Sequence, residues 1–241
     1  MKLDARTRLF IILAGIFSTC LIVGDIIGGK LVQTTMFGQL FTTTVGMIPF
    51  PVTFLLTDVL NEFYGKRAAR FVTLLGFGLA VLSFVVIFIA GSVPIADLAR
   101  EPGWNGVTES AFANVFLGSQ RMIAASLTAY VVSQFVDIGV FHALRKVTNN
   151  RFLWLRATGS TVVSQLIDTV TITFVAWSGT LTVPQMTNMI FSAYTLKIMI
   201  ALALTPFVYL AHSIVERGLG IAPVALDGEA ATREVPLPVR D

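Results

Sequence analysis

Charge is scarce in this sequence. Only 13% of its 241 residues are charged and 55% are hydrophobic, whereas a typical soluble domain has about 25% charged residues. A water-soluble fold of this size would lack the polar side chains needed to cover its surface. The composition therefore excludes an ordinary soluble domain and indicates an integral membrane protein.

Residues that hold metals or nucleotides are also scarce. The single cysteine, Cys20, lies in an apolar block, so neither an intrachain disulfide nor a cysteine-ligated zinc site is expected. His142 and His212 are far apart, and no cluster of histidine, cysteine and carboxylate residues has metal-ligand spacing. A phosphate-binding loop and a Ser/His/Asp catalytic set are missing too. We expect a protein that is not an enzyme and that uses no metal and no cofactor.

Apolar blocks of membrane-spanning length recur through the chain. A helix needs about 20 apolar residues to cross a bilayer. Five blocks meet this requirement: Leu9–Ile27, Phe71–Gly91, Met122–Leu144, Thr158–Trp177 and Met189–Ile214. A sixth, Val45–Tyr64, is interrupted by Pro49 and Pro51. We expect Pro51 to open a helix of about 14 residues, roughly 21 Å long, that ends at Gly65. The charge-free stretch Leu31–Phe50 must then complete the crossing or form a re-entrant segment.

These blocks predict an all-α integral membrane protein with six transmembrane helices over residues 1–217. Most of the 17 lysines and arginines lie in alternate connections, on the same side as the two termini. The positive-inside rule therefore places both termini in the cytoplasm. Residues 218–241 combine prolines with charged residues, and we expect them to form a disordered cytoplasmic tail.

Polar residues gather on one face of the short helix expected to begin at Pro51. Asp58, Asn61 and Glu62 follow the i, i+3, i+4 pattern, and ionisable residues inside a span usually face an interior cavity. For Asp58 the pattern favours a functional role. Glu62 and Asn61 either share that role or lie at the cytoplasmic interface in contact with water.

The motif Ser-Gln-x-x-Asp occurs in two consecutive blocks. Counted from the cytoplasmic ends of antiparallel helices, Gln134 lies level with Asp168, and Asp137 lies level with Gln165. We expect an amide opposite a carboxylate at each level, which forms a polar layer lining a substrate site. The alternative is that these side chains only pair with each other and hold two helices together.

Two lysines, Lys30 and Lys197, lie in or near the apolar blocks. Lys197 is about two turns inside the last block, where it either extends its side chain to the outer interface or balances the charge of a buried aspartate. Asp25 and Lys30, near the outer end of the first block, are expected to form an interfacial pair.

The run Pro51–Gly65, with its Thr-Asp-x-x-x-Glu-x-Tyr-Gly pattern, resembles the signature of the queuosine precursor transporters, also known as putative vitamin uptake transporters. The resemblance covers roughly residues 9–215. It continues through further matching positions: Trp154-Leu155-Arg156, Ser160-Thr161, Ser164-Gln165, Asp168, Tyr194, Lys197, Pro206 and Tyr209.

The resemblance implies uptake of 7-cyano- or 7-aminomethyl-7-deazaguanine, or of queuine, for salvage into transfer RNA. It also implies a six-helix fold similar to the substrate-capture subunits of energy-coupling-factor transporters, with no dedicated ATPase. The expected location is a bacterial inner membrane. The expected partners are the deazaguanine and the lipid bilayer but no nucleic acid, and a homo-oligomer is left open.

The polar residues suit a guanine-like substrate. A carboxylate can accept both donors of the guanine edge, and charge-assisted hydrogen bonds of this kind are strong. Gln134 or Gln165 can read the ring carbonyl, and Phe54 or Trp177 can stack on the flat ring. The candidate substrate-binding residues are Asp58, Asn61, Glu62, Gln134, Asp137, Gln165, Asp168, Lys197, Phe54 and Trp177.

Two other functions compete with a self-sufficient transporter. The chain can be a substrate-binding subunit that needs a separate ATPase module, or an intramembrane enzyme that uses its aspartates. Uptake by cells that make this chain alone separates the first alternative from a transporter, and persistent chemical change of a membrane substrate by the purified protein would support the second.

Overall fold

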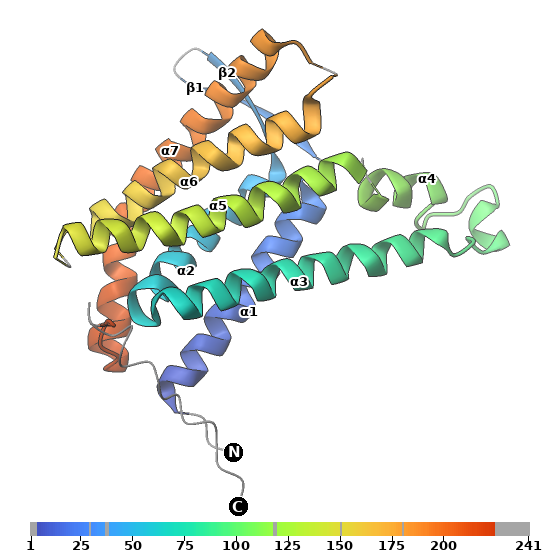
Figure 1. Cartoon of the computed structure of the whole chain (residues 1–241). Helices are drawn as coiled ribbons and strands as arrows, with labels where there is room; N and C mark the ends of the chain where they lie inside the picture. The colour runs from blue at the N-terminus through green and yellow to red at the C-terminus, as the bar shows by residue number, and fades with distance from the viewer. Residues whose placement is uncertain are drawn as a thin grey trace, which may run out of the picture.

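Long helices dominate the computed structural model, which describes residues 4–28, 30–36, 39–117, 120–149, 151–179 and 181–224 (Figure 1). The long helices are α1 (Ala5–Ile27), α3 (Gly65–Ser92), α5 (Gln120–Val147), α6 (Leu153–Trp177) and α7 (Val183–Ser213). Within the described part of the chain, five helices are long and apolar enough to cross a membrane, and they correspond to the five expected blocks.

The sixth block forms the short helix α2 (Phe50–Phe63, 14 residues), as predicted. Pro51 lies in its first turn, where the missing N–H is no loss. The helix stops before Gly65, whose φ of +77° is a left-handed conformation that favours glycine. Most residues from Thr53 to Phe63 are buried, so α2 is enclosed by the other helices.

A β-hairpin precedes α2. Strands β1 (Leu31–Met36) and β2 (Gln39–Thr44) pair antiparallel, with Leu31 opposite Thr44, and a 3-10 turn over Val45–Met47 leads into α2. The hairpin lies beside the N-terminal end of α7 (Figure 1). Strands were not expected here, although the β-branched valine and threonine residues of this stretch suit them. Among the described residues, the five long helices and α2 correspond to the six expected segments, the hairpin takes the place of the expected re-entrant stretch, and a similarity to energy-coupling-factor subunits stays a prediction.

The apolar core joins α1, α2, α3 and α5. Phe17 and Phe63 are among its most buried side chains. A Cβ on Gly76 would lie 3.1 Å from the Tyr130 hydroxyl and 3.2 Å from the Phe17 ring, so a glycine at this position lets α3 approach its neighbours closely. The Tyr130 hydroxyl donates to the carbonyl of Thr73 at 3.1 Å. Helix α3 therefore contributes to the packing of the bundle.

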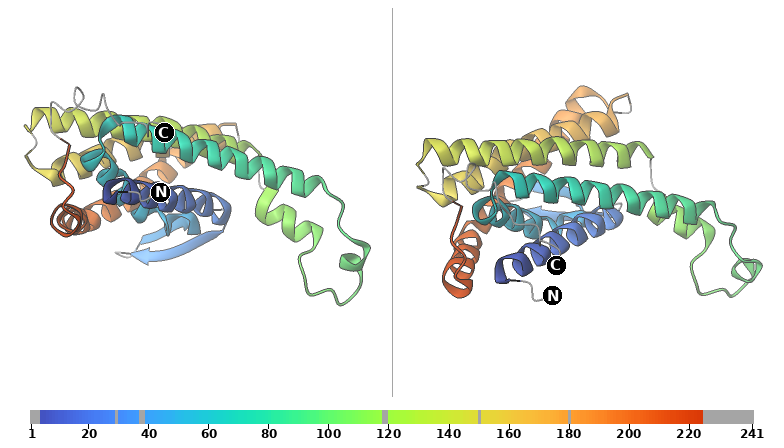
Figure 2. Two further views of the ribbon diagram at one scale, coloured as in Figure 1. Left: turned by 90° about the horizontal axis from the view of Figure 1, so that it is seen from below. Right: turned by 60° about the horizontal axis from the view of Figure 1, so that its bottom comes forward.

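Helices α5 and α6 run antiparallel and side by side (Figures 1 and 2). The turn between them contains Asn149 and Phe152, both with positive φ. Beyond α3, the chain forms a 3-10 turn (Asp97–Arg100), the short helix α4 (Glu109–Phe112) and a π turn (Ala113–Leu117). These segments extend past the main bundle (Figure 2).

The chain returns to the bundle after α7. Following a π turn (Ile214–Gly218), Ile221 is buried in the core. The backbone N–H of Val224 donates to the carbonyl of Glu62 at 3.0 Å, and the Arg145 guanidinium donates to the carbonyl of Val224. These contacts lie beyond the predicted domain boundary at residue 217. Residues 225–241, the rest of the predicted disordered tail, lie outside the described residues.

Candidate functional site

Two hydrogen bonds of the same type join the two Ser-Gln-x-x-Asp motifs. Ser133 on α5 donates to Asp168 on α6 at 3.3 Å, and Ser164 on α6 donates to Asp137 on α5 at 3.1 Å. The serine of each motif therefore serves the aspartate of the other, as a pseudo-two-fold arrangement requires. We predicted glutamine opposite aspartate, but the hydrogen bonds come from the neighbouring serines. Serine and aspartate lie four residues apart on one helical face, and the short serine side chain bridges closely packed helices.

The two glutamines are buried beside these bonds. The side-chain oxygens of Gln134 and Gln165 have no hydrogen-bond partner among the described residues, and neither does either polar side-chain atom of Asn61, which is 0% exposed. A buried acceptor without a partner costs about 1–3 kcal/mol. These groups are therefore available to a ligand or to water.

Lys197 balances the charge of Asp168. Its Nζ lies 2.6 Å from Asp168 Oδ2 and 5.0 Å from the centre of the Phe50 ring. The lysine is buried, so the interpretation that it extends to the outer interface is wrong, and the counter-charge interpretation is confirmed. The contact joins α6, α7 and the first residue of α2.

Glu62 forms a second ion pair. Arg156 Nη2 lies 2.6 Å from Glu62 Oε1, and both side chains are only 3% exposed. Of the two interpretations of Glu62, contact with water at the cytoplasmic interface is therefore wrong. In the sequence Arg156 counts among the cations of the α5–α6 connection, but it lies in the first turn of α6, inside the bundle.

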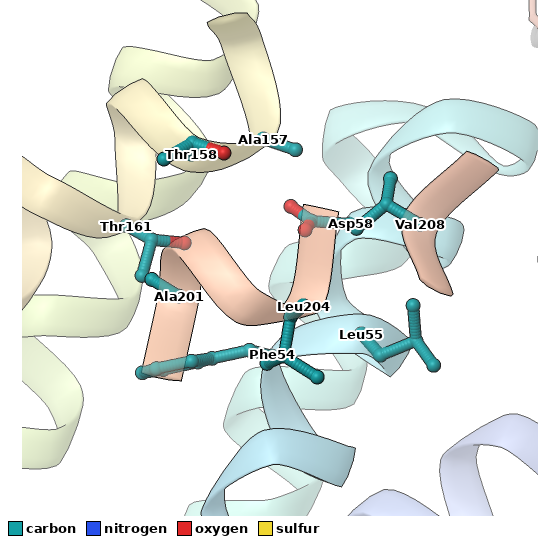
Figure 3. A pocket seen from close by; sticks show the side chains of 9 residues that line it. All are labelled: Phe54, Leu55, Asp58, Ala157, Thr158, Thr161, Ala201, Leu204 and Val208. Atoms are coloured by element: carbon teal, nitrogen blue, oxygen red, sulfur yellow. The ribbon is translucent and has the colours of Figure 1, made fainter. Parts of the chain in front are cut away.

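A small pocket lies between α2, α6 and α7 (Figure 3). Its empty volume of about 240 Å³ includes the solvent at its mouth. The lining residues are Phe54, Leu55, Asp58, Ala157, Thr158, Thr161, Ala201, Leu204 and Val208. The Asp58 side chain is buried, and no hydrogen bond joins its carboxylate to another of the described residues. The site therefore offers one strong acceptor in an otherwise mostly apolar pocket.

The structure divides the ten predicted site residues into groups. Only Phe54 and Asp58 line the pocket. The charges of Glu62, Asp137 and Arg156 act on Asp58 electrostatically. The remaining candidates lie elsewhere: Asn61 further along α2, Gln165 one turn beyond Thr161 on α6, Gln134 on α5, Asp168 and Lys197 in their ion pair, and Trp177 at the end of α6.

Three partners of these residues were not singled out from the sequence as such. Ser133 and Ser164 stand in the repeated motif itself, so their roles could have been found there. Arg156 had no local signal, because its partner Glu62 is 94 positions away. Asp25 also differs from expectation: it accepts a hydrogen bond from Ser126 at 3.0 Å, and no ion pair with Lys30 occurs among the described residues.

Comparison with known proteins gives a family match that contains this site. Residues 44–211 match the family model described as "Putative vitamin uptake transporter". A "Probable queuosine precursor transporter" of Bacillus subtilis (strain 168) is 35% identical over 176 residues, which is 72% of this chain and 73% of the relative. The "Queuosine precursor transporter" of Escherichia coli (strain K12) is 31% identical over 137 residues, 57% of this chain and 56% of the relative. No solved structure matches.

Proposed function

Because the chain belongs to the vitamin uptake transporter family, we propose that this multi-pass membrane transporter imports 7-deazaguanine precursors of queuosine. The names of its relatives from Bacillus subtilis and Escherichia coli support this substrate class. Those relatives are named transporters, and the chain is a transporter rather than an enzyme.

The observation that carries the substrate proposal is the Asp58 carboxylate, which lies on the pocket wall without a hydrogen-bond partner among the described residues. The guanine-like edge presents a ring N–H and an exocyclic amine side by side, and one carboxylate can accept both. Phe54 lines the same pocket and offers a face for the ring, an interaction worth about 1–3 kcal/mol per base in comparable sites. Gln165, one turn from the pocket residue Thr161, is the better placed of the two glutamines to read the ring carbonyl.

The balance of charges favours one precursor. Glu62 is neutralised by Arg156, and Asp168 by Lys197. Asp58 and Asp137 have no cationic partner within hydrogen-bond distance among the described residues. A bound cation stabilises the charged form of a buried carboxyl group that has no cationic partner. We therefore propose that 7-aminomethyl-7-deazaguanine, whose aminomethyl group is protonated at neutral pH, is preferred to the uncharged 7-cyano compound.

Uptake measurements test this function. A bacterial host that can neither make nor import the precursors is supplied with this chain alone, and accumulation of labelled 7-aminomethyl-7-deazaguanine is followed over time. We expect accumulation above the level of an empty-vector control and of the Asp58→Asn variant. If accumulation requires an added ATPase module, the chain is a binding subunit instead. If the host never accumulates the compound and the purified protein does not bind it, the substrate assignment is wrong.

A further inference from the structure

The pocket lies between two ion pairs along α6. Arg156 of the Glu62 pair and Asp168 of the Lys197 pair are twelve residues apart, roughly 18 Å at 1.5 Å per residue. The pocket residues Thr158 and Thr161 lie between them. The separation is smaller than the hydrocarbon thickness of about 30 Å, so the two pairs fit together within the depth of a bilayer.

The other two walls of the pocket show the same order. On α2, Phe54 and Asp58 lie between Phe50, which contacts Lys197, and Glu62. On α7, the pocket residues Ala201, Leu204 and Val208 all follow Lys197. On each of the three helices, the Lys197 pair or its Phe50 contact therefore marks one end of the pocket, and on α2 and α6 the Glu62 pair marks the other.

The end near Glu62 is closed by a further contact. The carbonyl of Glu62 accepts a hydrogen bond from Val224, and the carbonyl of Val224 accepts one from Arg145 on α5. The segment after α7 thus connects α2 to α5 beside the Glu62 pair, with Ile221 anchored in the core. Release of a substrate past this end requires these polar contacts to separate.

We propose that the Glu62–Arg156 and Lys197–Asp168 ion pairs are the two gates of the transport pathway, one at each end of the Asp58 pocket. Each pair joins two different helices, so its separation lets those helices move apart while the other pair stays closed. Opening at one end at a time is what alternating access requires. The proposal rests on the transport function proposed above, but it predicts which side of the pocket opens and does not depend on the identity of the substrate.

Thiol labelling tests the gates directly. Cys20, the single cysteine, is replaced by alanine, and the pocket residue Thr161 by cysteine. A charged, membrane-impermeant methanethiosulfonate reagent is then added to right-side-out or inside-out membrane vesicles. The double variants Glu62→Gln/Arg156→Gln and Asp168→Asn/Lys197→Gln each remove one gate without leaving a buried unpaired charge. A matched control, Asp97→Asn/Arg100→Gln, removes an exposed ion pair of 3.5 Å beyond α3.

We expect each gate variant to be labelled at least about tenfold faster than the control, because an open state populated at about 1–10% becomes the major one. The two variants should respond to reagent added on opposite sides. Labelling of either at the control rate, or of both from the same side, would overturn the proposal.

If a double variant does not reach the membrane, Glu62→Asp and Lys197→Arg retain the charges but alter the contacts. They should show smaller accelerations from the same two sides, and control rates for them would overturn it equally. Failure of uptake with intact side-specific labelling would refute only the substrate.

Discussion

Arg156 and Glu62 are 94 positions apart in the sequence, yet they form a fully enclosed ion pair between the start of α6 and the end of α2. Neither charge has access to water that could compensate for the loss of its partner. Loss of one partner alone therefore leaves the other as a buried charge without compensation.

Replacing Arg156 with methionine should lower the free energy of unfolding by about 3–5 kcal/mol, because Glu62 is left as a buried charge without a cation. Denaturant unfolding of the purified protein in detergent micelles measures this loss. The double variant Glu62→Gln/Arg156→Gln should recover most of it. A single variant as stable as the parent would show that the pair contributes nothing to folding.

Replacing Asp58 with asparagine should reduce uptake at limiting substrate about tenfold to a hundredfold, since a hydrogen bond to a charged group is worth about 1.5–3 kcal/mol. The amount of protein in the membrane should not fall, because a carboxylate inside a span costs about 2.5–3.5 kcal/mol to insert. Uptake normalised to membrane protein checks both statements. Asp97→Asn, at an exposed position, is the matched control, and undiminished uptake by Asp58→Asn would exclude Asp58 from the site.

The two interhelical serine bonds should be equivalent in energy. Ser133→Ala and Ser164→Ala should each lower stability by about 0.6 kcal/mol, the average for such bonds in membranes. Double-mutant cycles with Asp168→Asn and Asp137→Asn, respectively, measure the two coupling energies. Coupling in one pair but not in the other would contradict the pseudo-two-fold arrangement.

Gly65 should be intolerant of a side chain for reasons of backbone conformation alone. An added Cβ would meet the Val224 side chain at 3.8 Å, an ordinary contact, but the φ of +77° is strained for alanine. Gly65→Ala should therefore cost about 1–2 kcal/mol of stability. Gly139→Ala, in the middle of α5 with nothing within 4 Å, should instead stabilise by about 0.5–1 kcal/mol. Equal unfolding midpoints for the two variants would refute this explanation.

Competition between precursors tests the charge balance of the site. Unlabelled 7-aminomethyl-7-deazaguanine should inhibit uptake of the labelled compound at a lower concentration than the 7-cyano analogue does. The Asp137→Asn variant should reduce this difference, because one of the two uncompensated carboxylates is removed. Equal inhibition by the two compounds in the parent protein would show that the Asp58 and Asp137 carboxylates do not distinguish between the two precursors.

Local sequence signals were sufficient to predict much of the bundle. The limits of α2 followed from Pro51 and Gly65, since each residue imposes a backbone conformation that begins or ends a helix. The hairpin over Leu31–Thr44 was missed because a charge-free stretch rich in threonine suits a strand and a re-entrant segment equally. Its pairing depends on contacts between two strands and not on a helical period.

Part of the site was predictable from the sequence, because a charged side chain inside a membrane span is energetically costly and so indicates a function. Asp58, Asp168 and Lys197 were found because charges inside a span are expensive. The partner of Glu62 was harder to predict, because Arg156 reaches Glu62 only once α2 and α6 have packed together. A charged residue near the end of an apolar block looks the same in sequence whether it faces the cytoplasm or the core.

The return of the chain to the bundle at Val224 also sets an order of events during synthesis. Val224 is synthesised only after all of α7. Its contacts with Glu62 and Arg145 are therefore among the last to form within residues 4–224. Until then, the newly made transporter has one end of its bundle unsealed, and ribosomes that stall before this point leave it in that unfinished state.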